Sequence, residues 1–290
     1  MREVSNHASA LGEAIGSMLE GEIHRILKPI AEDKGCIYVT AGAVNQRTGR
    51  TTKLILTDNS GNGYNIDSVI INNRFQPLVV LESKYIRYKK HNRDKASWIC
   101  TAHTKLRERY TTIRKSIAVL MGNWSYPSRR LLESFEVELF HISFDEICNV
   151  LAYHDIPYNW AENNRQQAQE CWITFSQLSQ TDKEVIAEEL IAVVKNDLRE
   201  SLEIALDESL PRTVNSVRLV ITSNRGETYT YNFSNLEETV TFLASYDQEK
   251  DMDTSNSPVL LSTSAPLPTN LELAEVIELD EDKELSELDE

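Results

Sequence analysis

Pro77-Leu-Val-Val-Leu-Glu-Ser-Lys84 is a nearly continuous apolar run that ends in charged residues, and it decides the fold. Runs of this kind are typical of strands in the middle of a sheet, where both faces are covered. Side chains alternate between the two faces of a strand, so we expect Glu82 and Lys84 to project from the same face, about 7 Å apart. The preceding stretch 64–71 has the pattern of a half-buried strand and carries Asp67.

Asp67, Glu82 and Lys84 thus form a group of charges at the edge of an apolar sheet. Charged groups are costly to remove from water unless a partner compensates them. A divalent cation would supply that partner, and an ammonium beside it would orient or help to deprotonate a water molecule. The alternative is a surface hairpin with ordinary charged residues, which the hydrophobicity of residues 78–81 disfavours.

Asp67, fourteen intervening residues and then Glu82-x-Lys84 resemble the motif of the PD-(D/E)xK nuclease superfamily, the fold of most type II restriction endonucleases. The proline that usually precedes the aspartate is absent, and Ile66 stands there instead. The resemblance covers about residues 10–150. It implies an α/β fold with a restriction-endonuclease-like αβββαβ core, in which a mixed central sheet is flanked by helices.

The resemblance also implies a site and an activity. Asp67, Glu82 and the backbone carbonyl of Ser83 would bind Mg²⁺, and Lys84 would position the attacking water. The expected protein is a Mg²⁺-dependent, site-specific endodeoxyribonuclease of the type II restriction kind. It would act on double-stranded DNA as a cytoplasmic homodimer, with a companion DNA methyltransferase as a further partner. The alternatives are a repair or recombination nuclease without sequence specificity, and a catalytically inactive DNA-binding or interaction protein.

Residues 8–34 have the periodicity of an amphipathic helix. Glu22 falls inside its apolar arc, between the directions of Met18 and Ile26. Superfamily members often carry an acid from the first helix that joins the metal shell, so the resemblance makes Glu22 the candidate and Glu20 the reserve. The alternative for Glu22 is a helix-edge glutamate at the solvent boundary.

The net charge of −15 is unevenly distributed. Residues 247–290 hold fourteen Asp and Glu against two Lys, so the remaining 246 residues carry only −3. Residues 84–130 hold thirteen Lys and Arg against two acids, and a cationic stretch that begins at a hydrolytic site suits a phosphodiester backbone. The ordinary alternative is a solvated helix face. The DNA-binding residues predicted in this stretch are Lys89, Lys90, Arg93, Lys105, Arg109, Arg129 and Arg130.

Trp124 lies in a loop just before Arg129 and Arg130, and two interpretations of this loop stay open. The loop could enter a groove of DNA and read guanine edges. It could equally anchor the following helix through the tryptophan.

Further elements follow from local patterns. Strands are predicted at 36–43 and 51–57, and their close succession with the two motif strands indicates antiparallel pairing. Downstream, helices at 94–115, 125–135 and 144–153 alternate with strands at 116–122 and 137–142, which predicts parallel pairing after residue 84.

We predict four segments. Residues 1–155 form the nuclease core, 156–212 a helical C-terminal extension, 213–246 a small β-hairpin-plus-helix unit and 247–290 an acidic disordered tail. The helix of the small unit is expected to begin at a Ser234 cap. The apolar stripe of the helices in 161–210 has little else to cover, so we expect it to form the homodimer contact. The tail would aid solubility or compete with DNA for the cationic stretch.

Several classes of protein are disfavoured. No run approaches the ~20 apolar residues of a membrane span, and the first residues lack the apolar core of a signal peptide. The four cysteines contain no C-x-x-C pair, which favours buried thiols in a reducing cytoplasm over zinc ligands or disulfides. No P-loop, G-x-S-x-G or H-E-x-x-H motif is present.

Overall fold

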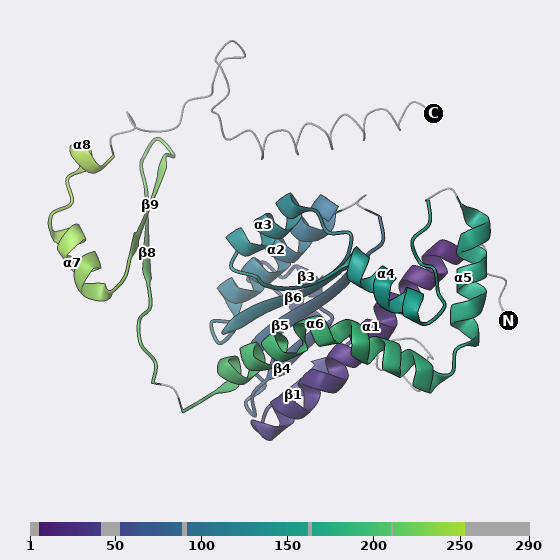
Figure 1. Ribbon diagram of the computed structural model, residues 1–290. Helices are drawn as coiled ribbons and strands as arrows, with labels where there is room; N and C mark the ends of the chain where they lie inside the picture. The colour runs from purple at the N-terminus through teal and green to yellow at the C-terminus, as the bar shows by residue number, and fades with distance from the viewer. Residues whose placement is uncertain (1–5, 42–52, 89–91, 162–163, 210, 253–290) are drawn as a thin grey trace, which may run out of the picture. The chain divides into compact units, whose positions relative to one another are not determined.

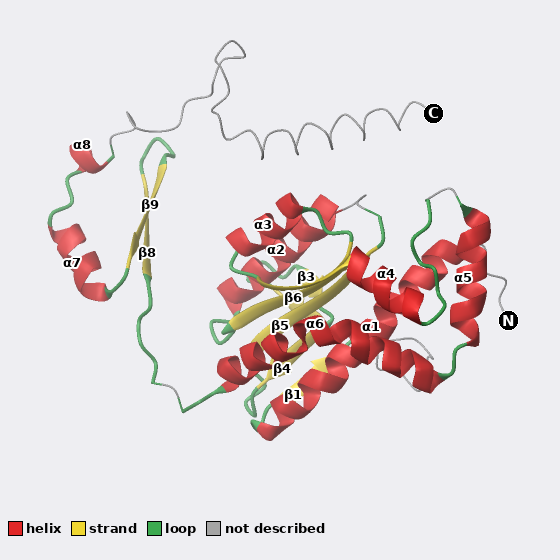
Figure 2. Ribbon diagram, in the orientation of Figure 1, coloured by secondary structure: helices red, strands yellow, loops and turns green. Residues whose placement is uncertain are grey.

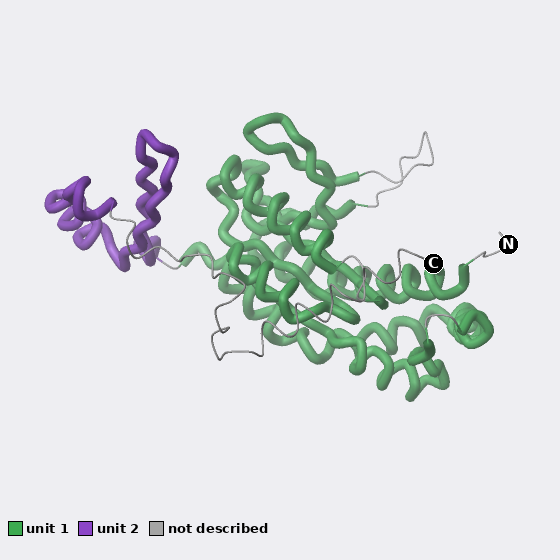
Figure 3. Tube along the Cα trace, turned by 90° about the horizontal axis from the view of Figure 1, so that it is seen from above, with its two compact units in different colours: residues 1–210 green, residues 211–290 purple. Residues whose placement is uncertain are grey.

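The computed structural model describes residues 6–41, 53–88, 92–161, 164–209 and 211–252. These fall into two compact units, residues 1–210 and 211–290, each of which is considered by itself (Figure 3). Within the described ranges, no helix combines the length and the hydrophobicity that crossing a bilayer requires.

The first unit is built on a five-stranded mixed sheet, as the sequence predicts (Figure 2). Its first three strands form an antiparallel meander, and its last three run parallel to one another. The spatial order is β1 (Ile37–Thr40), β4 (Ser68–Ile71), β5 (Pro77–Ile86), β6 (Lys115–Gly122) and β7 (Glu138–Ser143). The change of direction falls at β5, so the most hydrophobic strand lies in the centre of the sheet.

The predicted strand 64–71 is two strands. Gly63–Asn65 (β3) pairs with Ile55–Thr57 (β2) in a separate antiparallel hairpin, whereas β4 begins at Ser68 and joins the central sheet. The chain changes partner at Ile66 and Asp67, and this break leaves Asp67 immediately before β4.

Helices cover both faces of the sheet (Figure 1). On one face lie α2 (Asn92–Arg109) and α3 (Tyr126–Ser134). On the other face α1 (His7–Asp33) is joined by α4 (Phe144–Tyr153), α5 (Arg165–Gln177) and α6 (Gln180–Leu206). The larger hydrophobic core belongs to this second face, where side chains of α1 and α6 pack with Val79, Leu81 and Val119 of the sheet.

The helical segment 156–212 is therefore not an extension of a finished core. The apolar stripe of α6, which includes Ile186, Leu190 and Leu198, is buried in the same cluster as α1. The stripe was expected to form the homodimer contact because nothing else in the chain covered it. That premise is wrong, because α1 and the sheet cover the stripe. Residues 1–210 form one unit, without a boundary at 155.

The second unit contains the predicted hairpin, β8 (Val217–Thr222) and β9 (Thr228–Phe233), followed by α7 (Leu236–Ala244) and a short α8 (Gln248–Asp251). Asn235 rather than Ser234 caps α7, because its side-chain oxygen accepts from the Glu238 amide at 2.9 Å. Helix α8 also lies within the predicted disordered tail, and residues 253–290 of that tail lie outside the described ranges.

Candidate active site

Asp67, Glu82 and Lys84 meet where β4 and β5 begin to pair. Ser68 pairs with Leu81, so Asp67 lies at the level of Glu82 on the neighbouring strand. Lys84 Nζ is 2.8 Å from Asp67 Oδ2 and 2.5 Å from Glu82 Oε2. The backbone N–H of Ser83 donates to Asp67 Oδ2 at 2.9 Å. The two motif strands therefore bring the three ionisable groups together, with Lys84 in contact with both carboxyl groups.

Glu82 and Lys84 project from the same face of β5, as predicted from strand alternation. Val80 belongs to the same buried cluster as Leu106 of α2, and Ile86 to the same cluster as Ile99 of α2, so the even-numbered residues of this stretch face that helix. Glu82 and Lys84 lie between them in this alternation. The charged group is thus located between the central strand and α2.

The carboxyl group of Glu82 is the least compensated member of the trio. It is 0% exposed, and neither of its oxygens receives a hydrogen bond of normal geometry from the described residues, although Lys84 Nζ lies close to one of them. Burial raises the pKa of Glu82 to about 9; Lys84 opposes that rise, and the charge of Asp67 adds to it. Glu82 therefore holds a proton at neutral pH.

Asp67 and Lys84 are both charged at neutral pH. Burial acts to raise the pKa of Asp67, but Lys84, a hydrogen bond with Glu82 and the Ser83 N–H outweigh it, and the pKa is lowered. Burial acts to lower the pKa of Lys84, but Glu82 and Asp67 outweigh it, and the pKa is raised. An ammonium of this kind can orient a ligand and stabilise negative charge, whereas it is a poor proton acceptor.

The donor set fits a hard divalent cation. Two adjacent carboxyl groups that share a single ammonium, one of them fully buried, form a group that a further cation would stabilise. Mg²⁺ is commonly bound by one or two carboxylates and keeps several waters, and Asp67 and Glu82 supply that number. Across the described ranges no cluster of three or more His, Cys, Asp and Glu has the geometry of a metal site. A further protein ligand beyond these two carboxylates would be an oxygen of another kind, such as the Ser83 carbonyl.

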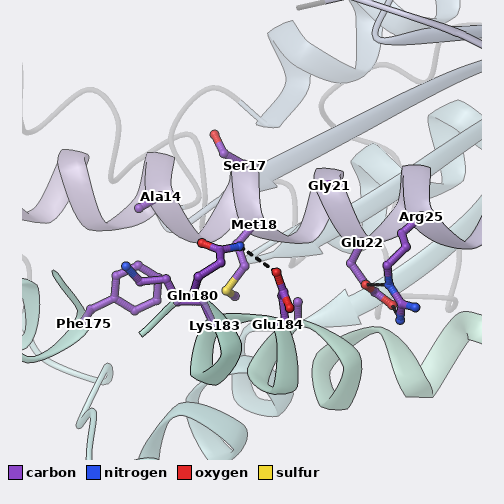
Figure 4. A pocket seen from close by; sticks show the side chains of 11 residues that line it. Ala14, Ser17, Met18, Gly21, Glu22, Arg25, Phe175, Gln180, Lys183 and Glu184 are labelled. Atoms are coloured by element: carbon purple, nitrogen blue, oxygen red, sulfur yellow. Dashed lines mark hydrogen bonds and ion pairs between the residues drawn. The ribbon is translucent and has the colours of Figure 1, made fainter. Parts of the chain in front are cut away.

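Glu22 does not point into this group. Its carboxylate forms a bidentate pair with Arg25, with 2.6 Å between Glu22 Oε2 and Arg25 Nε and 2.7 Å between Glu22 Oε1 and Arg25 Nη2. Arg25 also contacts Glu188 of α6 at 2.6 Å. Figure 4 shows the Glu22–Arg25 pair at one end of a groove of about 450 Å³ between α1 and the helices α5 and α6. The buried carboxylate of Glu22 is explained by this pair, so the reason for placing it in the metal shell is removed.

Glu20, the reserve candidate, lies nearer to the motif. It lines a smaller hollow of about 340 Å³ together with Ser83. Glu20 is also 3.4 Å from His24 Nε2, and His24 Nδ1 is 2.9 Å from the Tyr38 hydroxyl. The same hydroxyl donates to Ser68, the residue next to Asp67, at 3.2 Å. A continuous series of polar contacts therefore links Glu20 to the start of β4.

The described candidates for DNA binding mostly have partners inside the protein. Lys105 pairs with Glu108 and Arg130 with Glu133, both at 2.8 Å. Arg109 donates to the Asp58 carbonyl at 2.6 Å and so attaches the β2–β3 hairpin to α2. Arg129 is 3.2 Å from His141, and Arg93 is exposed in the first turn of α2. Lys89 and Lys90 lie outside the described residues.

The alternative role of Trp124 as an anchor is the one that the structure shows. The indole is buried, and its N–H donates to the backbone carbonyl of Lys84 at 3.2 Å. The loop after β6 is therefore hydrogen-bonded to the backbone of the motif lysine and fixes this part of β5.

The end of β5 is secured a second time by Arg87. Its buried guanidinium donates to the carbonyls of Tyr158 and Trp160 at 2.8 and 3.2 Å, and it lies 3.8 Å from the centre of the Trp160 ring. Tyr85 and Tyr158 share a hydrogen bond of 2.5 Å between their hydroxyls. The segment that precedes α5 thus braces the strand that carries the candidate site.

Two residues near the site were missed by sequence reasoning. Lys95 lies in the first turn of α2. Its pKa is lowered, first by partial burial and second by the nearby charge of Lys84. His103 is fully buried in the same helix, and both Lys84 and Asp67 act on its pKa. Their spacing to Ile99 places all three on one helical face, which is the signal that the sequence offered.

Comparison with known proteins identifies no family. No protein-family model matches the chain, and no curated protein matches it. One solved structure, the crystal structure of a protein of unknown function, AF1548, aligns at 12% identity with a TM-score of 0.30. The alignment covers 60% of this chain and 98% of that one. A likeness at that TM-score carries no argument about fold or function.

Proposed function

We propose that this protein is a Mg²⁺-dependent endodeoxyribonuclease, of the type II site-specific restriction kind. The observation that carries the proposal is the contact of Asp67 and Glu82 with Lys84 at the junction of two sheet strands. The buried carboxyl group of Glu82 lies beside that of Asp67, and Lys84 is the one cation that contacts both among the described residues, which suits a site for a further cation.

Each residue of the trio has a role in the proposed reaction. Asp67 and Glu82 would hold Mg²⁺, together with the carbonyl of Ser83. When bound, the metal would act as a Lewis acid on the phosphodiester and favour ionisation of a water molecule. Lys84 stays protonated because of the two carboxyl groups, so it would orient the attacking water and stabilise the charge that develops on the phosphate.

The order of elements supports the same proposal. Helix α1 precedes the antiparallel strands β1, β4 and β5, and α2 then leads to β6, which is parallel to β5. This is the αβββαβ order of the restriction-endonuclease-like core. The β2–β3 hairpin would be an insertion between the first and second strands of that core.

The proposed partners follow from the proposed reaction. Double-stranded DNA is the substrate, and cleavage of both strands of a short site usually requires two copies of the active site, hence the expected homodimer. A restriction enzyme in the cytoplasm would also have a companion DNA methyltransferase. All four cysteines are free, three of them buried and Cys36 partly exposed, which suits a reducing compartment.

The test is cleavage of unmethylated phage DNA by the purified protein, in Mg²⁺ and in EDTA. Lys84→Ala is the active-site variant, and Lys28→Ala, at an exposed position of α1, is the matched control. We expect discrete Mg²⁺-dependent fragments from the wild type and from Lys28→Ala. We expect a loss of at least about 100-fold in rate for Lys84→Ala, since removal of one electrostatic donor commonly has that effect. Cleavage by Lys84→Ala at the wild-type rate would refute the proposal.

The same experiment separates the alternatives. A smear in place of discrete bands would indicate a nuclease without sequence specificity. Tight DNA binding with no cleavage of several DNAs would indicate an inactive DNA-binding protein on the same fold.

A further inference from the structure

Trp98 of α2 differs from the other tryptophans of the chain. There are four, and all of them lie in the described ranges. Trp124 and Trp160 are buried, and Trp172 packs against the larger hydrophobic core. Trp98 is 39% exposed and belongs to none of the hydrophobic clusters of the described residues. A single exposed apolar side chain is common on protein surfaces, so its position decides what it can do.

Trp98 lies on the flank of α2 that faces β4. Residues four positions apart share a face of a helix, so Ala102 is the neighbour of Trp98 on this flank. Ala102 is buried in the same cluster as Ile66, the residue that immediately precedes Asp67. Cys100, on the other flank of the helix, is instead buried with residues of β6. The indole therefore lies on the same side of α2 as the aspartate of the candidate site.

The surroundings of the indole are open and carry positive charge. The side chains of Asp67 and Lys84 are 15% and 27% exposed, so solvent reaches the candidate site. The first turn of α2, one turn before the indole, carries Arg93 and Lys95 against the single acid Asp94. Excess positive charge beside an open site favours an anionic polymer over a neutral partner.

An indole in this position adds a contact that cations cannot make. Aromatic side chains stack on nucleobases, and this contact tolerates any base because every base has a flat face. In a DNA duplex each base is already stacked on its neighbours. An indole on the protein surface can therefore stack only on a base that has left the helical stack.

We propose that Trp98 is the stacking platform for one unstacked base of the DNA strand that enters the candidate site. The inference rests on the proposed function and adds a feature of the substrate to it. The strand would reach Asp67 and Lys84 with its phosphates on the positive first turn of α2 and one base on the indole.

The experiment measures binding of a fluorescein-labelled strand of thymidines by fluorescence anisotropy. The strand is about 12 nucleotides long, within the range of single-strand binding sites. The second probe has the same length and the same phosphates, but abasic sites replace the thymidines. The protein is full length, and EDTA is present so that Mg²⁺-dependent cleavage does not disturb the titration.

The variants are Trp98→Ala and Trp98→Phe, with Tyr153→Ala as the control. Tyr153 is an aromatic residue that is 81% exposed, and it lies in α4 on the other face of the sheet. Thermal unfolding is measured for each variant. Since Trp98 lies outside the hydrophobic clusters, we expect both of its variants to unfold at the wild-type temperature.

We expect Trp98→Ala to bind the thymidine strand about 5- to 150-fold more weakly than the wild type. Trp98→Phe should recover part of the loss because it keeps a smaller ring, and the control should bind as the wild type does. On the abasic strand, Trp98→Ala and the wild type should bind equally. The slope of log affinity against log salt should not change in Trp98→Ala, because an indole carries no charge.

The two probes separate the inference from the proposed function. Equal binding of the thymidine strand by the wild type and Trp98→Ala, or an equal loss on both strands, overturns the inference alone. Equal affinity of the wild type for the two strands also overturns it, and that comparison needs no variant. A wild type that cleaves phage DNA in Mg²⁺ but does not bind the thymidine strand overturns the inference alone. A wild type that neither binds nor cleaves DNA overturns both.

Discussion

At the scale of single residues, the protonation of Glu82 links stability to pH. Its pKa is raised from 4.5 to about 9 by burial, so between these values the folded protein keeps a proton that the unfolded chain releases. The folded state therefore loses relative stability as pH rises through this window. The shifts of Asp67 and Lys84 act outside it, since the first lowers a pKa of 3.8 and the second raises a pKa of 10.5.

We predict that Glu82→Gln flattens this pH dependence. Gln is neutral at every pH and has nearly the same volume, so in EDTA the variant should gain stability relative to the wild type as pH rises from 5 to about 9. Thermal unfolding of both proteins across that range is the measurement. Glu200→Gln, at an exposed position of α6, is the control and should follow the wild type. Parallel profiles for Glu82→Gln and the wild type would show that Glu82 is ionised in the folded protein.

Lys95 gives a prediction about DNA. It lies near Lys84 in the first turn of α2, has no ion-pair partner among the described residues, and is opposed by the positive end of the helix dipole. A bound phosphate group would supply the missing negative partner and offset the repulsion from Lys84 and from the helix dipole. We predict that Lys95→Ala weakens DNA binding and lowers the slope of log affinity against log salt by about 1, the effect of one lost phosphate contact. Fluorescence anisotropy at several salt concentrations measures it, and an unchanged slope would contradict it.

Strand alternation predicted the candidate site well, whereas charge predicted the surroundings of other residues poorly. Alternation along an apolar strand was enough to place Glu82 and Lys84 on one face, and the spacing to Asp67 brought in the third member. Charge alone did not reveal the internal partners of other residues. Arg109 was predicted to face DNA, yet it donates to Thr57 and Asp58 of the β2–β3 hairpin, a partner fifty residues away that no local pattern reveals.

At the scale of elements, the break between β3 and β4 shows the same limit. The pattern of residues 64–71 is continuous, but its two halves pair with different strands, and only the tertiary fold decides which partner each half takes. Asp67 lies at that change of partner, and this position makes it accessible to Lys84.

Gly122, the last residue of β6, gives a prediction about how β5 and β6 are held together. Gly122 has a φ of +92°, and a Cβ on it would lie 2.0 Å from the carbonyl oxygen of Ile86, which accepts a hydrogen bond from Asn123 at 2.7 Å. Gly122→Ala should therefore separate the ends of β5 and β6, next to the motif. We predict a loss of at least about 2 kcal/mol in the free energy of unfolding.

Gly21 is the matched control for that substitution. It lies inside α1, where a Cβ would meet nothing within 4 Å. Gly21→Ala should leave stability unchanged or raise it by up to about 1 kcal/mol, because alanine is the better helix former. Chemical denaturation of both variants decides the matter, and equal effects at the two positions would contradict the account of Gly122.

At the scale of the whole molecule, the segments predicted from composition differ from the units that pack together. Residues 156–212 were separated from the core because the family resemblance ends near residue 150, and the apolar stripe of their helices had no visible partner in the sequence. In the structure α6 covers the stripe of α1, and the two helices together supply nearly half of the buried residues of the larger core. Two amphipathic helices far apart in sequence bury each other's apolar faces. Periodicity predicts which face of each helix is apolar, but it does not predict which element covers that face.

This packing predicts what truncation does. A chain that ends after residue 210 keeps both helices, whereas one that ends after residue 155 exposes the buried face of α1, including Leu11, Ile15 and Leu19. Each such side chain contributes about 1.5–3 kcal/mol on burial, so the free energy lost by exposing them exceeds the stability of an ordinary domain.

We therefore expect residues 1–210 to unfold cooperatively and to keep the Mg²⁺ affinity of the full-length protein. We expect residues 1–155 to bind a hydrophobic dye and to show no cooperative transition. Circular dichroism and dye fluorescence distinguish the two, and a cooperative transition of residues 1–155 at the full-length temperature would mean that α1 does not need α6.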